Sequence, residues 1–429
     1  MSYISREQPS HSIPSSISIP PINIYALSGG DSIHVLSTES TELIQLEVRF
    51  NAGSWYQDKP FQALLTGKML SEGTKSYNSK TIAETIDFYG GYYAISVNKD
   101  FSSMQFVLPK IYLHKVLPVI AEIIFESTIP NPELKIAKDN LNHQIKLDNQ
   151  QGDILANKQL LSTMFGSNHP YGKSGTPEDV NRISREDIIN FYKTCYLTKN
   201  ATIFIVGNIS DKDLGITQHY LSPSRQIVAA SKKNYLIEPS KEQNVFICRN
   251  QSTQASIRIG KILFTKSHPD FIDLHIATTV LGGYFGSRLM SNLREDKGYT
   301  YGVGSFLTTY LNSGFFGIST EVGLEHTEAA IAEIYSEIDR LQKHTISDEE
   351  LLRVKNYLTG SYLKNFDGSF NIMNQYISLI SQNLTQNFTE DYLSSITKIR
   401  SVRIQELFNR YLDKASLSEV VVGKSLKYN

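Results

Sequence analysis

The feature that most constrains this chain of 429 residues is that its sequence repeats itself. When the sequence is compared with itself at a displacement of 216 residues, apolar positions meet apolar positions and glycine meets glycine without a gap. The residues Val180, Ile183, Ile188, Phe191, Tyr192, Val206 and Gly207 correspond to Ile396, Ile399, Ile404, Leu407, Phe408, Val422 and Gly423. Further upstream, Phe61, Leu64, Leu70 and Gly73 correspond to Phe271, Leu274, Val280 and Gly283. The repeat predicts two copies of one unit of roughly 200 residues.

Within each copy, short strand-like runs are followed by longer helical patterns. This order predicts an α+β fold: two homologous domains, each an antiparallel sheet with mixed edges, covered by helices on one face and closing as a clamshell. In the first copy we expect strands at 33–37, 43–51, 92–97 and 104–108, and helices at 61–70, 81–89, 111–126 and 132–150. In the second copy we expect strands at 256–264, 301–309 and 315–320, and helices at 325–342 and after Ser347.

Turn and polar segments divide the chain further. Residues 1–22, rich in Ser and Pro, are expected to form an extended arm, and residues 222–244 a polar linker. The N-terminal domain then spans 23–221 and the C-terminal domain 245–429. At two helix starts we expect caps: a capping box at Ser184, and Asn131 before Pro132.

Composition excludes several classes of protein. The 42 basic and 43 acidic residues leave no positive field for nucleic acid or an anionic membrane. No apolar run approaches the roughly 18 residues of a membrane span, and no signal peptide is recognisable, so we expect a soluble protein, cytoplasmic or periplasmic. The cysteines Cys195 and Cys248 lack metal-ligand spacing and are expected to be reduced and buried.

The residues alone show no complete catalytic set. The ten histidines are scattered, and none forms an H-E-x-x-H motif or its inverted form. His268 and His275 are expected to be loop or packed residues rather than ligands. In "SRLMSNLREDKGYTYGVGS", Arg294 lies near an expected helix end and Tyr301 at an expected strand start. By position alone, such an arginine is usually a solvated charge and such a tyrosine half-buried core.

That segment resembles the C-terminal-domain signature of the insulinase and pitrilysin superfamily of zinc peptidases, which includes the mitochondrial processing peptidase. The matching residues are Ser287, Arg288, Leu289, Leu293, Arg294, Glu295, Gly298 and Tyr301. "HPYG" at 169–172 and the end of the first copy are similar as well, so the resemblance covers nearly the whole chain after the arm. The two-fold repeat of the family agrees with the repeat in this sequence.

The resemblance also indicates where zinc ligands belong, and there the sequence departs from the family. Aligned on Gly73 and Thr74, the two histidines and the glutamate of H-x-x-E-H fall on Leu64, Lys68 and Gly67. The distal glutamate ligand falls near Gln144. Leucine and glycine offer no donor atom, and an ammonium repels Zn²⁺, so we expect a degenerate metal site and no cofactor bound by this chain.

What the resemblance implies is a zinc-less subunit of a heterodimeric peptidase. Arg294 would position or charge-stabilise a peptide carbonyl, and Tyr301 would donate to the tetrahedral intermediate, both in trans at the zinc site of a paralogous partner. The chain alone would be inactive, with a homodimer possible in isolation. Two alternatives stay open: a scaffolding subunit like the core proteins of respiratory cytochrome complexes, and a self-sufficient hydrolase with an unrelated site.

Overall fold

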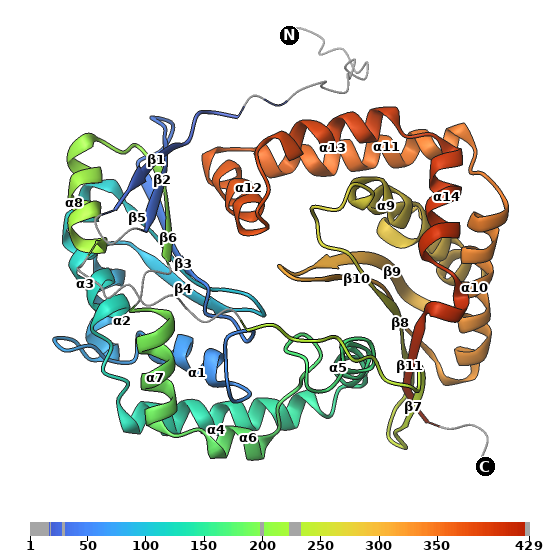
Figure 1. Cartoon of the computed structure of the whole chain (residues 1–429), viewed down its shortest axis with the longest axis horizontal. Coiled ribbons are helices and arrows are strands. Elements are labelled where there is room, and N and C mark those ends of the chain that lie inside the picture. The colour runs from blue at the N-terminus through green and yellow to red at the C-terminus, as the bar shows by residue number, and fades with distance from the viewer. Residues whose placement is uncertain (1–16, 18, 28–30, 198–200, 223–232, 425–429) are drawn as a thin grey trace, which may run out of the picture.

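The computed structural model describes residues 17, 19–27, 31–197, 201–222 and 233–424. They form two β-sheets that face each other across the molecule, with most helices on the outer sides (Figure 1). The α+β class with two domains, predicted from the sequence, is confirmed. Most of the expected arm and the first part of the expected linker lie outside the described residues. No helix in the described ranges is long and apolar enough to cross a membrane.

The first sheet has six strands in the order β1-β2-β6-β3-β5-β4. All neighbours are antiparallel except β2 and β6. The strands are β1 (Asn23–Ala26), β2 (Ser32–Ser37), β3 (Leu43–Phe50), β4 (Tyr92–Val97), β5 (Ser102–Pro109) and β6 (Ala201–Gly207). The helices of this half are α1 (Gln62–Met69), α2 (Ser79–Phe88), α3 (Leu113–Phe125), α4 (Asn131–Asp148), α5 (Gly152–Phe165), α6 (Pro177–Arg182), α7 (Arg185–Cys195) and α8 (Asp211–Leu221).

The second sheet has five strands in the order β7-β11-β8-β10-β9, with only β7 and β11 parallel. The strands are β7 (Asn244–Cys248), β8 (Gln254–Leu263), β9 (Thr300–Thr309), β10 (Gly314–Gly323) and β11 (Ser418–Gly423). The helices are α9 (Phe271–Thr278), α10 (Thr327–Lys343), α11 (Asp348–Leu363), α12 (Ser369–Ser381), α13 (Asn387–Lys398) and α14 (Ser401–Tyr411). Two π-helical turns, Thr279–Gly283 and Met290–Asp296, connect α9 to β9.

The order of elements in the second half follows that of the first at an almost constant displacement. Elements α4, α5, α7 and β6 begin at residues 131, 152, 185 and 201. Elements α11, α12, α14 and β11 begin at residues 348, 369, 401 and 418, which is 216 or 217 residues later in every case. The displacement read from the sequence is therefore also the displacement between structural elements.

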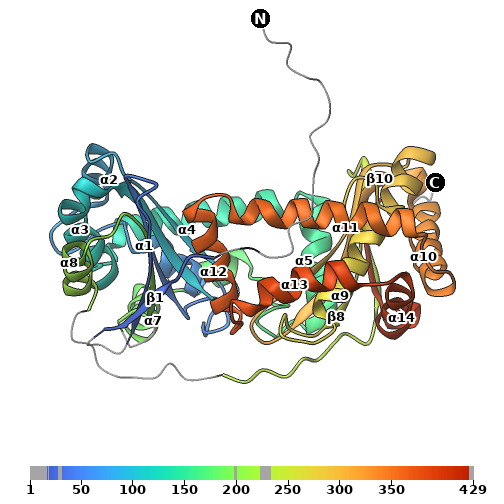
Figure 2. The same cartoon turned by 90° about the horizontal axis from the view of Figure 1, so that it is seen from above.

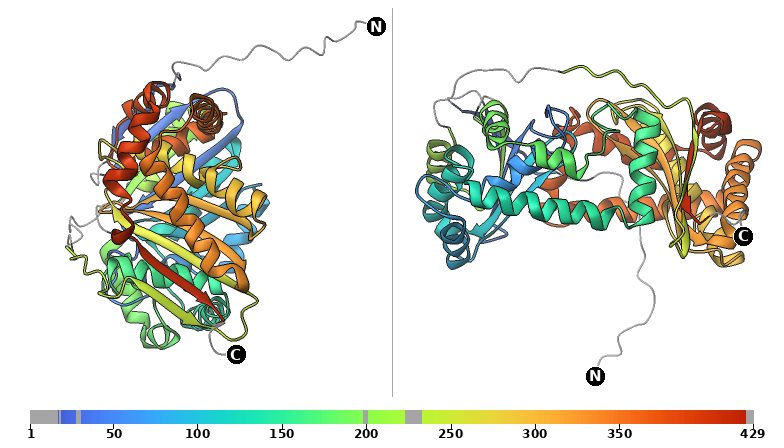
Figure 3. Two further views of the ribbon diagram at one scale, coloured as in Figure 1. Left: turned by 90° about the vertical axis from the view of Figure 1, so that its right-hand side faces the viewer. Right: turned by 90° about the horizontal axis from the view of Figure 1, so that it is seen from below.

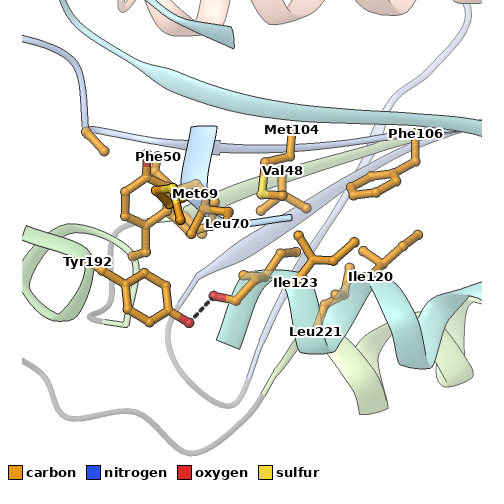
Figure 4. Close-up of a cluster of buried hydrophobic side chains, with 14 of the residues drawn as sticks. Val48, Phe50, Met69, Leu70, Met104, Phe106, Ile120, Ile123, Tyr192 and Leu221 are labelled. Carbon is orange, nitrogen blue, oxygen red and sulfur yellow. Dashed lines mark hydrogen bonds between the residues drawn. The ribbon is translucent and has the colours of Figure 1, made fainter. Parts of the chain in front are cut away.

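Each domain has its own hydrophobic core between its sheet and the outer helices. In the first domain, Val48, Phe50 and Met104 of the sheet pack with side chains of α1 and α3 (Figure 4). The Tyr192 hydroxyl donates to the Ile124 carbonyl at 2.8 Å within this core. The side-chain hydrogen bond therefore joins α7 to the C-terminal end of α3.

The two domains also exchange one helix each across the space between the sheets. Figure 2 shows α12 of the second half beside the first sheet, and Figure 3, right, shows α5 beside the second sheet. Apolar side chains of α12, including Met373 and Ile377, are buried against Leu36, Phe204 and Val206 on the inner face of the first sheet. This face is therefore not free of helices, as a sheet covered on one side only would be.

The matching contact of α5 with the second sheet has the same character. Leu160 and Met164 pack closely enough that a Cβ atom on Gly260 of β8 would lie 3.1 Å from both side chains. The Arg258 guanidinium donates to the Asn157 amide oxygen at 2.8 Å. Burial of apolar side chains on both exchanged helices stabilises the arrangement of the two domains.

Three local expectations have clear outcomes. The capping box at Ser184 is confirmed, with Ser184 and Asp187 bonding each other's backbone N–H. The cap expected at Asn131 is wrong, because α4 already begins at Asn131 and follows Pro130, which has no side-chain acceptor. Cys195 is buried as expected, but Cys248 is exposed because it lies on the edge strand β7.

A histidine at the α12 contact makes the packing of the domains sensitive to pH. His34 Nδ1 lies 2.7 Å from the Tyr376 hydroxyl, and burial lowers the pKa of His34 below its usual 6.5. Protonation therefore favours the state in which His34 is exposed, so its contribution to stability is complete above pH 6.5 and decreases as the pH falls below that value.

We expect the thermal midpoint of the protein to fall between about pH 7.5 and about pH 5 by a smaller amount in His34→Phe than in wild type. Differential scanning calorimetry at the two pH values measures both changes. His114→Phe, which replaces an exposed histidine, serves as the control and should keep the wild-type pH dependence. An equal fall in His34→Phe and wild type would contradict this prediction.

Candidate functional site

The segment that contains Arg294 and Tyr301 is held in place by the other residues of the same motif. Leu289 and Leu293 are completely buried in the core of the second domain. The Arg288 guanidinium makes two parallel hydrogen bonds, of 2.9 and 3.0 Å, to the Glu350 carboxylate on α11. This pairing also raises the pKa of Arg288. These residues anchor the segment and leave Arg294 on the opposite side of the π-helical turn.

Polar contacts to α10 fix the start of the turn that follows. The Asn292 amide donates to the carboxylates of Glu333 and Glu337 at 2.9 and 2.7 Å. Lys297 pairs with Glu333 at 3.0 Å. The hydrogen bonds from Asn292 and Lys297 hold the pKa of Glu333 below its usual range. The base of the turn is therefore fixed by buried and half-buried contacts rather than by the exposed side chains.

Backbone geometry then reverses the chain into the edge strand β9. Gly298 has a φ of 66°, a conformation that glycine adopts without strain, and the Tyr299 N–H donates to the Leu293 carbonyl at 2.8 Å. A β-bulge follows, because Thr300 faces Val322 and Val303 faces Thr320, so that two residues of β9, Tyr301 and Gly302, oppose one of β10. Bulges of this kind redirect side chains at sheet edges.

The Tyr301 side chain is directed into solvent by this geometry. Its exposed fraction is 89%, so it is not the half-buried core residue that its position alone suggested. Arg294 is exposed as well, with its guanidinium carbon 5.0 Å from the centre of the Phe285 ring. Phe285 is itself 61% exposed, and the sequence gave no reason to select it. An arginine stacked on an exposed aromatic ring keeps its N–H groups free to donate.

The four positions aligned with the zinc ligands lie on two neighbouring helices of the first domain. Leu64, Gly67 and Lys68 are on α1, and Gln144 is on α4, which contacts α1. Lys68 and Gln144 are exposed, and the Gln144 amide donates to Asp148 of its own helix at 2.7 Å. Leu64 packs against the core. None of these side chains presents a ligand to a metal ion.

The space that a glutamate would need at position 67 is filled. A Cβ atom placed on Gly67 would lie 2.4 Å from Cγ2 of Val97 on β4, far inside van der Waals contact. The helix therefore approaches the sheet more closely than any residue other than glycine allows. Among the described residues, no group of three His, Cys, Asp or Glu side chains is arranged to hold a metal ion. The residues at this place do not fit zinc.

Family models match both halves of the chain. Residues 33–174 match the model described as insulinase (peptidase family M16), and residues 182–358 match the peptidase M16 inactive domain. The chain belongs to peptidase family M16. The resemblance seen in the sequence is confirmed at the level of the family, and the two matched segments cover most of the two domains.

Relatives of this M16 chain include proteins named for peptidase activity and one named for its absence. An uncharacterized zinc protease, YmxG, of Bacillus subtilis is 24% identical over 81% of this chain and 85% of its own length. The non-peptidase homolog YmxG of Helicobacter pylori is 22% identical over 89% of both chains. A crystal structure of a peptidase M16 inactive domain from Pseudomonas fluorescens matches with a TM-score of 0.87 and 23% identity, covering 94% of this chain and 98% of that one.

The tight contact at position 67 predicts an unusual response to substitution. Gly67→Ala should lower the free energy of unfolding by about 1–3 kcal/mol, because the new methyl group overlaps Val97. Gly215→Ala is the matched control: Gly215 lies within α8 with open space around its Cβ position, so alanine there should stabilise by about 0.5–1 kcal/mol.

Urea unfolding measures both effects, and Val97→Ala combined with Gly67→Ala should recover part of the loss. If Gly67→Ala stabilises the protein as Gly215→Ala does, α1 does not approach β4 as closely as described.

Proposed function

We propose that this chain is the non-catalytic subunit of a heterodimeric zinc-dependent peptidase, and that it binds peptide and supplies Arg294 and Tyr301 to the active site of its partner. The observation that carries the proposal is the contrast between the two halves. Arg294 and Tyr301 extend into solvent from an anchored segment, whereas Leu64, Gly67 and Lys68 occupy the ligand positions without donor atoms for a metal.

The proposed roles follow from the chemistry of the two exposed groups. The Arg294 guanidinium can donate to a peptide carbonyl and lower the cost of negative charge on its oxygen. The Tyr301 hydroxyl can donate to the same oxygen when water adds to the carbonyl carbon and the oxyanion forms. Since both side chains leave the surface of this chain, the acceptor they serve belongs to another molecule.

We further propose the division of the chain that these roles require. Residues 1–22 form an extended arm, 23–221 a peptidase-like domain with a degenerate zinc site, 222–244 a linker, and 245–429 the domain that carries Arg294 and Tyr301. The partner is a paralogous chain with an intact H-x-x-E-H motif, and zinc is bound there. Homologues of the processing-peptidase kind act as such pairs.

The test combines this chain with its zinc-bearing paralogue and follows cleavage of a quenched fluorescent peptide. We expect little zinc and little activity for the isolated chain, and activity on mixing. In the mixed complex, Arg294→Ala and Tyr301→Phe should each lower kcat/KM about 10²–10³-fold, because each removes a donor to the developing oxyanion. Gel filtration of each variant with the partner verifies that assembly is retained.

Two replacements of similar exposed residues serve as controls. Arg353→Ala removes an exposed arginine of the same domain, and Tyr112→Phe removes a surface hydroxyl of the other domain; both should leave kcat/KM unchanged. Stoichiometric zinc in the isolated chain would refute the proposal. Unchanged activity of Arg294→Ala and Tyr301→Phe complexes would indicate the scaffolding alternative instead.

A further inference from the structure

The second domain contains a cavity that the proposed role of Arg294 and Tyr301 does not use. Its volume is about 500 Å³, within the range of about 300–1,000 Å³ typical of small-molecule sites. Elements α9, α11, α12, α13 and β9 contribute its walls, and these elements gather on one side of the second sheet in Figure 1. Aromatic side chains dominate part of the wall, among them Phe271, Tyr362, Phe388 and Tyr392.

A single uncompensated charge lies in this wall. Lys266 is half-buried, with its ammonium 5.0 Å from the centre of the Phe388 ring, and within the described part of the chain no carboxylate lies within ion-pairing distance of it. The cavity lining includes no aspartate or glutamate. Burial lowers the pKa of Lys266, which reflects the cost of keeping this charge out of water without a partner. Buried charges in proteins are normally paired.

The neighbouring histidine does not add a second charge. His275 lies in α9 with Nδ1 3.1 Å from the Tyr392 hydroxyl. Burial, assisted by the charge of Lys266, lowers the pKa of His275 to about 4, so the imidazole is neutral near pH 7. Lys266 therefore carries the only positive charge at this cavity, and Thr278, which also lines it, has a buried hydroxyl without a hydrogen-bond partner in the described structure.

The position of the cavity within the repeat gives it a second meaning. At the displacement of 210 residues, Thr278 corresponds to Lys68, and at the displacement of 217 between α4 and α11, Ser361 corresponds to Gln144. Both Thr278 and Ser361 line the cavity. The open space in the second domain thus lies where the first domain has its degenerate zinc positions, and there the contact of Gly67 with Val97 leaves no room.

We propose that this cavity binds a carboxylate that carries an aromatic side chain, as at the C-terminal end of a peptide, with Lys266 as its counter-charge. The ammonium donates to the carboxylate, and hydroxyl and amide groups such as those of Thr278, Ser361 and Gln375 supply further donors. The aromatic wall takes the apolar side chain. A phosphate fits less well, because its second charge has no partner and the aromatic surface would contact nothing apolar.

Isothermal titration calorimetry on the full chain tests the inference with matched probes. N-acetyl-L-phenylalanine should bind, and N-acetyl-L-phenylalaninamide, which lacks only the charge, should bind at least about tenfold more weakly. Lys266→Met, which keeps an unbranched side chain, should weaken binding of the acid by about thirtyfold or more. Its thermal midpoint should equal or exceed that of wild type, because it removes an unpaired charge.

The control is Lys261→Met, which replaces another half-buried lysine of the same domain outside the cavity, and it should bind the acid as wild type does. Equal affinity for the acid and the amide, an unaffected Lys266→Met, or equally tight binding of inorganic phosphate would each overturn the inference. So would a lack of binding of the acid at millimolar concentration.

The same titration separates this inference from the proposed function. The Arg294→Ala, Tyr301→Phe double variant should bind N-acetyl-L-phenylalanine as wild type does, because neither residue lines the cavity. If the partner complex shows no dependence on Arg294 and Tyr301 while this binding persists, the proposed function is wrong and the cavity site stands. If the double variant loses the binding, the assignment of the site to the cavity is wrong.

Discussion

The reciprocal packing of α5 and α12 is the interaction on which the rest of the structure depends. Each helix follows the long helix of its own half, α4 or α11, and lies on the inner face of the opposite sheet. Two sheets that exposed their inner faces fully would present large apolar surfaces to water, which is costly. The exchanged helices cover part of each face and hold the two domains as one unit, so the orientation of the segment with Arg294 and Tyr301 is set by the whole chain.

A motif of conserved appearance can combine residues with different physical tasks, and the structure separates them here. Arg288, Leu289 and Leu293 are occupied with α11 and with the core, and Gly298 provides the turn. Only Arg294 and Tyr301 extend from the surface, and the Phe285 ring supports the first of them. An anchored segment with two exposed donors is suited to recognising a group on another molecule, because little ordering is required on binding.

Sequence reasoning predicted the architecture well because the repeat and the periodicity of apolar residues are global signals. The strands β3, β4 and β9, for example, begin within one residue of their expected positions. It did not predict the exchanged helices, since amphipathic patterns say which face is buried but not against which domain. The β-bulge at Tyr301, the stacking of Arg294 on Phe285 and the cavity around Lys266 arise from contacts between residues distant in the chain, which a single sequence does not reveal.

The central claim is that Arg294 and Tyr301 serve an active site in another chain. The most direct measurement is a structure of this chain in complex with its zinc-bearing paralogue and an uncleavable peptide analogue. The account predicts that the Arg294 guanidinium and the Tyr301 hydroxyl lie within hydrogen-bonding distance of the peptide carbonyl that is held at the partner's metal. A complex in which both side chains face solvent or the lattice, away from the bound peptide, would contradict it.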